Sequence, residues 1–360
     1  MTVVKISATA GPFEPAVLRE DAGSWDRFVE SSPINAYTQL SAWADVKRAN
    51  GWSAERIVTD SGSGPIGGQV LLRRFRPTPF GVGYVPRGPV AQRLDRASLT
   101  AFTDELRELM HGSRLSHVTI DPEVDDPEAA RLLRALGWVR GRDVQPLETR
   151  LIDIDRPEPE IWGGLRSKWR QYVQKARRAG IEVIDSDAAG LDDFYRIMVE
   201  TGERTGFAHR TLETYRRSLE AYAARGAGRL LMARLPDGTP LATLILISCG
   251  RRVVEHAGGM TEAGAASRAN YLLKWEAIRS SSEAGFALYD LWGLARWRPG
   301  IEHFKAGFGG REVRYIGAWD LVGSAPMRAA LMGAYRLRFF MAQRRMSRDA
   351  ETGSEADRSP

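Results

Sequence analysis

The fold class follows from one stretch of sequence, Arg229-Leu-Leu-Met-Ala-Arg-Leu-Pro-Asp-Gly-Thr-Pro-Leu-Ala-Thr-Leu-Ile-Leu-Ile-Ser248. Two apolar runs flank the segment Pro236-Asp-Gly-Thr239, and this arrangement predicts two antiparallel strands joined by a tight turn. Residues 252–257 and 288–293 predict further strands, with a helical pattern at residues 270–285 between them. A strand meander, a helix and a returning strand favour an α+β fold over a doubly wound parallel sheet.

The same order of elements occurs in the first half of the chain. Predicted strands, a turn and helices follow one another at residues 52–60, 61–65, 66–75, 83–86, 95–111, 116–120 and 127–136. Because the pattern repeats, we expect two related halves. No low-complexity linker lies between them, and we place the boundary near residues 153–157.

The composition is that of a globular protein with core for two to three domains. The 360 residues are 43% hydrophobic and 27% charged, which excludes a disordered or fibrous chain. No apolar run approaches the roughly 18 residues of a membrane span, and the first residues carry no export signal. The single cysteine, Cys249, cannot form an internal disulfide, and we expect a buried thiol. These features predict a cytoplasmic protein.

The sequence lacks the residues that several kinds of chemistry require. The five histidines show no ligand spacing and one cysteine cannot build a zinc site, so we expect no metal. Gly-x-Ser-x-Gly and phosphate-loop motifs are absent. The segment Thr78-Pro-Phe-Gly-Val-Gly83 lacks the basic or amide residue that leads an acetyl-CoA pyrophosphate loop. We therefore expect no cofactor and do not favour coenzyme A as a donor.

Basic residues are concentrated in one helical segment. The net charge of +6 is compatible with RNA, nucleotide or membrane partners without requiring one. Between residues 165 and 179 six residues are basic and none is acidic, and Arg166, Arg170 and Arg177 share a face opposite an apolar stripe. This face is either solvated or follows the phosphates of a nucleic acid. Residues 327–345 form a second basic amphipathic segment, which packs on the body or contacts an anionic membrane surface.

A glycine-rich stretch, Gly300-Ile-Glu-His-Phe-Lys-Ala-Gly-Phe-Gly-Gly310, follows the last predicted strand. Glycine lets a backbone approach a ligand closely, Phe304 offers a stacking face and Lys305 offers a point charge. These properties suit a phosphorylated ligand that also carries a base. The alternative is a glycine-rich turn with one aromatic residue in the core.

Several segments together carry a resemblance to a known family. The string Tyr37-Thr-Gln-Leu-Ser-Ala-Trp-Ala-Asp-Val-Lys47, followed by Gly51-Trp52, resembles the N-terminal signature of the Fem (FemABX) family of aminoacyl-tRNA-dependent peptidoglycan-bridge peptidyltransferases. The match continues in the expected order over about residues 25–322. Its further segments are Pro86-Arg-Gly-Pro89 and residues 165–180, 271–278, 289–293 and 300–320.

The resemblance implies an α+β fold of two GNAT (acetyltransferase-like) domains, the second inserted into the first. Residues 1–152 would form domain 1, completed by a returning segment at 317–346, and residues 153–316 would form domain 2. Residues 347–360 would be a disordered tail. The implied partners are aminoacyl-tRNA and a peptidoglycan precursor, either UDP-MurNAc-pentapeptide or its lipid-linked form, with a peripheral contact to the inner membrane surface as a further expectation.

The resemblance also implies where the precursor binds. Lys47 and Trp43 lie four residues apart, on one helix face, and would line the precursor cleft near the diphosphate. Arg210 and Tyr215 would make the second contact to the precursor. The alternatives are a solvated helix residue for Lys47 and a surface ion pair for Arg210.

The other implied residues concern the tRNA and the reaction. An aminoacyl ester is already activated, so the protein must mainly position an amine and stabilise an oxyanion. Lys305 would supply the positive charge, with a structural lysine as the alternative. Asp121 would lie near the acceptor amine, with a helix cap before Pro122 as the alternative. The implied tRNA contacts are Phe304, Lys305, Arg166, Arg170 and Arg177.

Two further interpretations of the sequence stay open. The same fold could serve an acyltransferase or aminoacyltransferase of exopolysaccharide, lipid or peptide natural-product biosynthesis. It could also serve a non-catalytic protein that binds RNA or membranes. The leading interpretation is transfer of an amino acid from tRNA to the free amine of a cell-wall precursor.

Overall fold

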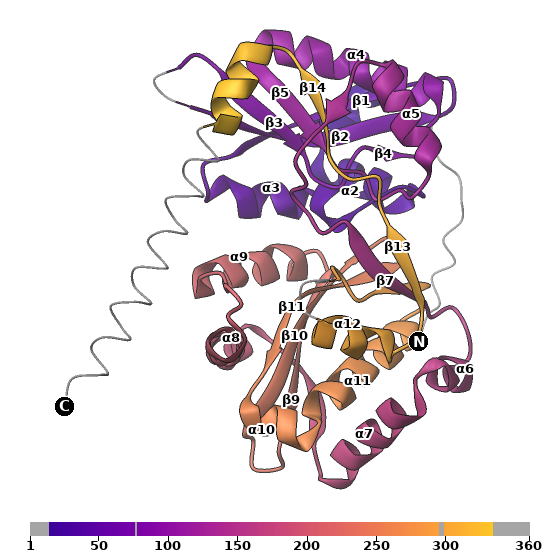
Figure 1. Ribbon diagram of the computed structural model, residues 1–360, viewed down its shortest axis with the longest axis vertical. Helices are drawn as coiled ribbons and strands as arrows, with labels where there is room; N and C mark the ends of the chain where they lie inside the picture. The colour runs from indigo at the N-terminus through magenta and orange to yellow at the C-terminus, as the bar shows by residue number, and fades with distance from the viewer. Residues whose placement is uncertain (1–13, 76–77, 295–298, 334–360) are drawn as a thin grey trace, which may run out of the picture.

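The computed structural model describes residues 14–75, 78–294 and 299–333. Its strands form two seven-stranded sheets, one above the other in Figure 1. The first sheet has the order β1 (Ser53–Asp60), β2 (Pro65–Arg74), β3 (Gly81–Val85), β5 (Leu115–Ile120), β14 (Trp319–Val322) and β6 (Val139–Arg140), with β4 (Val90–Ala91) beside β2. The second has the order β13 (Arg311–Arg314), β7 (Glu148–Asp153), β12 (Leu288–Asp290), β11 (Arg252–Met260), β10 (Pro240–Cys249), β9 (Gly228–Arg234) and β8 (Glu182–Ser186).

Each sheet has its own set of helices. Around the first lie α1 (Pro15–Glu20), α2 (Ala22–Ser31), the 3-10 turn η1 (Tyr37–Gln39), α3 (Ser41–Arg48), α4 (Arg96–Ser113) and α5 (Pro127–Ala135). Around the second lie α6 (Glu158–Gly164), α7 (Ser167–Arg178), η2 (Ala188–Gly190), α8 (Leu191–Thr205), α9 (Leu212–Ala223), α10 (Glu262–Ser267), α11 (Ala269–Glu283) and α12 (Pro299–Ala306). Helix α3 contacts α9 across the junction of the two halves (Figure 1).

The two sheets share the same connection between strands, and their architecture confirms the predicted α+β class. Each is antiparallel except for one parallel pair, β3 with β5 in the first sheet and β11 with β12 in the second. A helix, α4 or α11, lies between the paired strands in the sequence. The predicted hairpin is formed by β9 and β10. In its turn Asp237 Oδ1 accepts a hydrogen bond of 2.9 Å from the Thr239 N–H, and Gly238 has a φ of 89°.

Strand β14 returns late in the sequence to the first sheet. Trp319 pairs with Ile120 of β5 on one side and with Arg140 of β6 on the other. The predicted boundary after residue 152 falls inside β7, and the predicted division into domains stays a prediction. The predicted segment at 334–346 and the predicted tail at 347–360 lie outside the described residues.

A shared hydrophobic core joins the two halves. One buried cluster contains Trp25 and Trp43 from the first half together with Phe194, Tyr222 and Ile247 from the second. Each half also has a large cluster of its own, packed against its sheet. Cys249 belongs to the shared core and is 2% exposed, so the predicted buried thiol is confirmed.

A buried network of charges also crosses this junction. Glu123, which follows β5, contacts Arg87 at 3.0 Å and Arg252 of β11 at 2.5 Å. Arg252 pairs in turn with Asp290 of β12, whose side chain is fully buried. Because the charges of two arginines are compensated by two carboxylates with little access to water, each member depends on its partners.

Two local predictions need correction. Residues 299–306 form helix α12 and not a glycine-rich turn, because Phe304 and Phe308 pack on Tyr271 with ring centroids 5.0 and 6.3 Å away. The helix of the basic segment, α7, begins only at Ser167, since Leu165 and Arg166 have extended or near-extended backbones between α6 and α7. None of the described helices combines the length and apolar character needed to cross a bilayer.

Candidate active site between the two halves

Two cations predicted to bind the precursor lie close together where α3 meets the loop before α9. The Lys47 ammonium lies 4.4 Å from the centroid of the Trp43 ring, which is the predicted one-turn spacing. Burial, assisted by the charge of Arg210, lowers the pKa of Lys47 to about 8. In the described parts of the chain neither side chain has an ion-pair partner. Two uncompensated cations at one place favour an anionic ligand.

Tyr215 supports the Arg210 backbone from the protein interior. It is 3% exposed, packs against Phe194 with ring centroids 5.0 Å apart, and its hydroxyl accepts a hydrogen bond of 3.2 Å from the Arg210 N–H. The structure therefore places Tyr215 behind Arg210, where it fixes the backbone that carries the guanidinium.

An aromatic cluster lies beside Lys47, and most of its members were not predicted. Tyr37 is at its centre, with ring centroids 5.9 Å from Trp43, 5.7 Å from His256 and 5.6 Å from Trp292. His256 contacts the Tyr37 hydroxyl at 3.4 Å and the Ser218 hydroxyl at 3.2 Å. Burial and the charges of Arg210 and Lys47 lower the pKa of His256 to about 3, so the imidazole is neutral near pH 7.

Lys305, the predicted catalytic cation, lies on α12 and is anchored by backbone carbonyls. Its ammonium donates to the carbonyl oxygens of Trp292 at 3.2 Å and Gly293 at 2.7 Å. Burial lowers the pKa of Lys305 to about 8, with Glu255 opposing the shift and Lys274 adding to it. The group is thus mainly charged near neutral pH, and an ammonium has three donors, so one remains for a ligand.

A buried triad that was not predicted lies under Lys305 and Phe304. The Lys274 ammonium donates to both carboxylate oxygens of Glu255, at 2.6 and 2.5 Å, and the Tyr289 hydroxyl donates to the same carboxylate at 3.0 Å. Lys274 also lies 5.4 Å from the Phe304 ring. The triad therefore supports Phe304 and Lys305, two of the five predicted tRNA-contacting residues, from the protein side.

Trp292 connects the two groups of residues. Its carbonyl accepts from Lys305, and its ring packs on Tyr37, which in turn contacts Trp43 beside Lys47. Trp292 has a φ of 58°, a conformation that costs a bulky residue about 1–3 kcal/mol. Asp290 Oδ1 accepts a hydrogen bond of 2.7 Å from the Trp292 N–H and holds it there. The structure thus brings Lys47 and Lys305 into one continuous set of contacts.

Asp121 has its hydrogen bonds within the protein. Its carboxylate accepts from the Arg87 N–H at 2.6 Å and from the Tyr84 hydroxyl at 2.8 Å, and the residue is 2% exposed. Burial raises the pKa of Asp121 to about 6 against the opposing charge of Arg87. The next helix, α5, is capped by Asp126, so Asp121 is not its cap. Its predicted place near the acceptor amine stays a prediction.

The three predicted arginines of the basic segment have different surroundings. Arg166 lies beside α12, with Nη1 3.3 Å from His303 Nδ1. Arg170 donates to the carbonyls of Leu165 and, at 3.1 Å, Gly163, and so caps the end of α6. Arg177 forms an ion pair of 2.6 Å with Glu276 of α11. The structure therefore gathers only Arg166 with Phe304 and Lys305.

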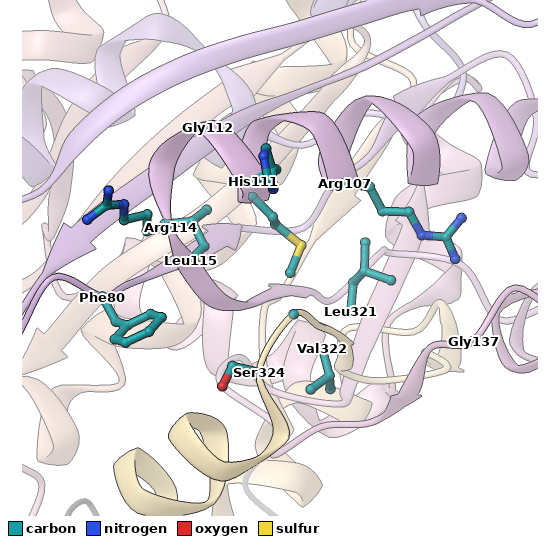
Figure 2. A pocket seen from close by; sticks show the side chains of 12 residues that line it. Phe80, Arg107, His111, Gly112, Arg114, Leu115, Gly137, Leu321, Val322 and Ser324 are labelled. Carbon is teal, nitrogen blue, oxygen red and sulfur yellow. The ribbon is translucent and has the colours of Figure 1, made fainter.

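A separate cavity of about 760 Å³ lies at the other end of the first sheet, lined by α4 and the end of β14 (Figure 2). Figure 2 shows Arg107 and Arg114 on opposite sides of it, directed apart. Arg107 is bound to Asp104 and to the Leu136 carbonyl. This cavity contains none of the predicted site residues, and its charges do not converge on one point.

Comparison with known proteins shows which families the chain resembles. Residues 21–128 match the FemAB family, and residues 163–306 match the Acetyltransferase (GNAT) domain. Two curated relatives are the Lipid II:glycine glycyltransferases of Staphylococcus haemolyticus (strain JCSC1435) and Staphylococcus aureus (strain MRSA252). Both are 30% identical over 222 and 223 residues, which cover 58% of this chain and 53% of each relative. These matches support a place in the Fem family.

Solved structures agree on the fold of this chain. FemX superposes with a TM-score of 0.80 at 21% identity, over 86% of this chain and 98% of FemX. L-PGS from Bacillus licheniformis gives a TM-score of 0.54 at 11% identity, over 89% and 97% of the two chains. The predicted GNAT-type fold is confirmed. The chain spans about half the length of the curated relatives that it matches.

Proposed function

We propose that this protein is an aminoacyltransferase that moves an amino acid from aminoacyl-tRNA to the free amine of a peptidoglycan precursor. One observation carries the proposal: a cationic site at Lys47 and Arg210 and a second at Lys305 are joined through Trp292. Such an arrangement suits two anionic substrates that meet end to end. The name of the curated relatives, Lipid II:glycine glycyltransferase, supports the same class of acceptor.

The two cationic sites divide the substrates between them. Lys47 and Arg210 would bind the diphosphate of the precursor, whether soluble or lipid-linked, since neither has an ion-pair partner among the described residues. The aromatic cluster around Tyr37 would contact the apolar faces of the precursor. Phe304 and Lys305 would bind the aminoacylated end of the RNA.

The reaction needs little covalent chemistry from the protein. The neutral amine of the precursor attacks the ester carbon, the bond from that carbon to the ribose oxygen breaks, and the amine proton ends on this oxygen through solvent. Lys305, held by two carbonyls, would stabilise the negative charge of the intermediate with its remaining N–H. Binding both substrates at adjacent sites would bring the two reacting atoms together.

The test is transfer by the purified protein from total tRNA charged with radiolabelled amino acids, with and without UDP-MurNAc-pentapeptide and its lipid-linked form. We expect label in the precursor, and we expect RNase treatment before the assay to abolish it. Label transferred only from acyl-CoA would instead support a different acyltransferase. Binding of RNA or precursor without any transfer would support the interpretation as a non-catalytic binding protein.

The lowered pKa of Lys47 predicts a pH dependence of precursor binding. Below a pKa of about 8 the ammonium is charged and attracts the diphosphate, so affinity should fall as the pH rises through about 8. Calorimetric titration of the precursor between about pH 7 and pH 9 measures this change. Lys47→Arg keeps its charge and should show a flat profile. An equal fall in both proteins would place the titrating group elsewhere.

A further inference from the structure

A row of partly exposed aromatic rings leads away from Lys305 over α12, α11 and α7. Phe304 lies 5.0 Å from Tyr271, and Tyr271 lies 4.8 Å from Tyr172, measured between ring centroids. We call these three residues the aromatic row. Trp169 is buried behind it, 5.4 Å from Tyr271, and its indole N–H donates to the Phe304 carbonyl at 3.0 Å. The row is thus held by the core on one side and partly open on the other.

Three cations border the aromatic row. The Arg268 guanidinium carbon lies 4.7 Å from the Tyr172 ring centroid, and the Lys168 ammonium lies 5.8 Å from the same centroid. Arg166 lies 5.7 Å from the Trp169 ring. Within the described ranges none of the three has an ion-pair partner, whereas Arg177 on α7 and Arg279 on α11 are both paired with Glu276. The aromatic row is therefore bordered by three cations that no described carboxylate neutralises.

The backbone conformation of Arg268 is unfavourable for a residue that is not glycine. It joins α10 to α11 with a φ of 67°, which costs a residue with a Cβ about 1–3 kcal/mol, and its Nε is buried without an acceptor. Glycine would meet the backbone requirement at this position at lower cost. An arginine held there over a tyrosine face therefore indicates a role for the guanidinium and not for the turn.

We propose that the aromatic row and its three cations bind the unpaired nucleotides that precede the aminoacylated end of the RNA. This inference rests on the proposed function. Bases of any sequence stack on aromatic faces, and Arg268, Lys168 and Arg166 lie where the phosphates between such bases would need positive charge. The row begins at Phe304, beside the proposed site of the ester, so the strand would continue over Tyr271 and Tyr172.

Fluorescence anisotropy with a short, end-labelled single-stranded RNA that ends in CCA tests this inference on the full chain. We expect Arg268→Gly and Tyr172→Ala each to weaken binding roughly tenfold, and Arg268→Gly to lower the slope of log affinity against log salt by about 0.7. Tyr172→Phe keeps the ring and should bind like the unchanged protein. Arg279→Gln removes an equal charge from a paired arginine of α11 and should change affinity less than about twofold.

The outcomes separate this inference from the proposed function. Arg268→Gly relieves an unfavourable φ, so its melting temperature should not fall, and weak binding cannot then be attributed to unfolding. RNA binding that is unaffected by both Arg268→Gly and Tyr172→Ala would overturn the inference alone. A protein that does not bind the RNA, or whose transfer resists RNase, would overturn the inference together with the proposed function.

Discussion

Lys305→Met is expected to lower turnover by a factor on the order of a hundred or more, while precursor binding stays the same. The ammonium is held by the Trp292 and Gly293 carbonyls beside the proposed ester site, and removing one oxyanion donor from a preorganised site typically has an effect of this size. Methionine matches the length of the lysine stem but carries no charge and no donor. Turnover at saturating substrates and calorimetric binding of the precursor measure the two quantities.

The matched control is Lys175→Met, which removes an exposed lysine from α7 in the same half of the chain. It should retain full turnover. The melting temperatures of both variants show whether either is misfolded, since Lys305→Met leaves two carbonyls without a donor. Unchanged turnover in folded Lys305→Met would refute a catalytic role for this residue.

Glu123→Gln is expected to lower the free energy of unfolding by about 3–5 kcal/mol. Glu123 contacts both Arg87 and Arg252, and the side chains of Arg87 and Glu123 are 4% and 3% exposed. Glutamine keeps the shape but removes the charge, so two buried guanidinium groups lose a shared counter-ion. Because Arg252 comes from the second sheet and Arg87 from the first, this loss also weakens the contact between the halves. Urea unfolding followed by circular dichroism measures the change.

An exposed pair close by provides the comparison. Arg251 and Asp155 form an ion pair of 2.7 Å with side chains 68% and 60% exposed, so Asp155→Asn should cost less than about 1 kcal/mol. The two variants remove one carboxylate charge each and differ mainly in burial. Similar stabilities for both would mean that the buried network does not hold the halves together.

Local features of this fold could be predicted from the sequence. The Asp237-Gly238 turn carries its own hydrogen-bonding group and its own left-handed residue, so it specifies β9 and β10 without help from distant residues. The spacing of Trp43 and Lys47 likewise fixes their contact on one helix face. Both are consequences of periodicity within one element.

The rest of the site depends on contacts between distant segments. Glu276, the partner of Arg177, is 99 residues away, and no pattern in the basic segment distinguishes this paired arginine from the unpaired Arg166. His256 gains its environment from Tyr37 and Ser218, on two other elements. Helix α12 was missed because Gly300 and the glycines that follow the helix favour a turn, while packing of Phe304 on Tyr271 stabilises the helix. The assignments of the site residues to substrates stay predictions.

The return of β14 governs the order in which this molecule can be completed during synthesis. Strand β14 lies between β5 and β6 in the first sheet and pairs with both. A nascent chain therefore lacks the strand between β5 and β6 in its first sheet while the second half is being synthesised. The first half acquires its final hydrogen bonds only when residues 319–322 emerge, so its closure is tied to translation of the second.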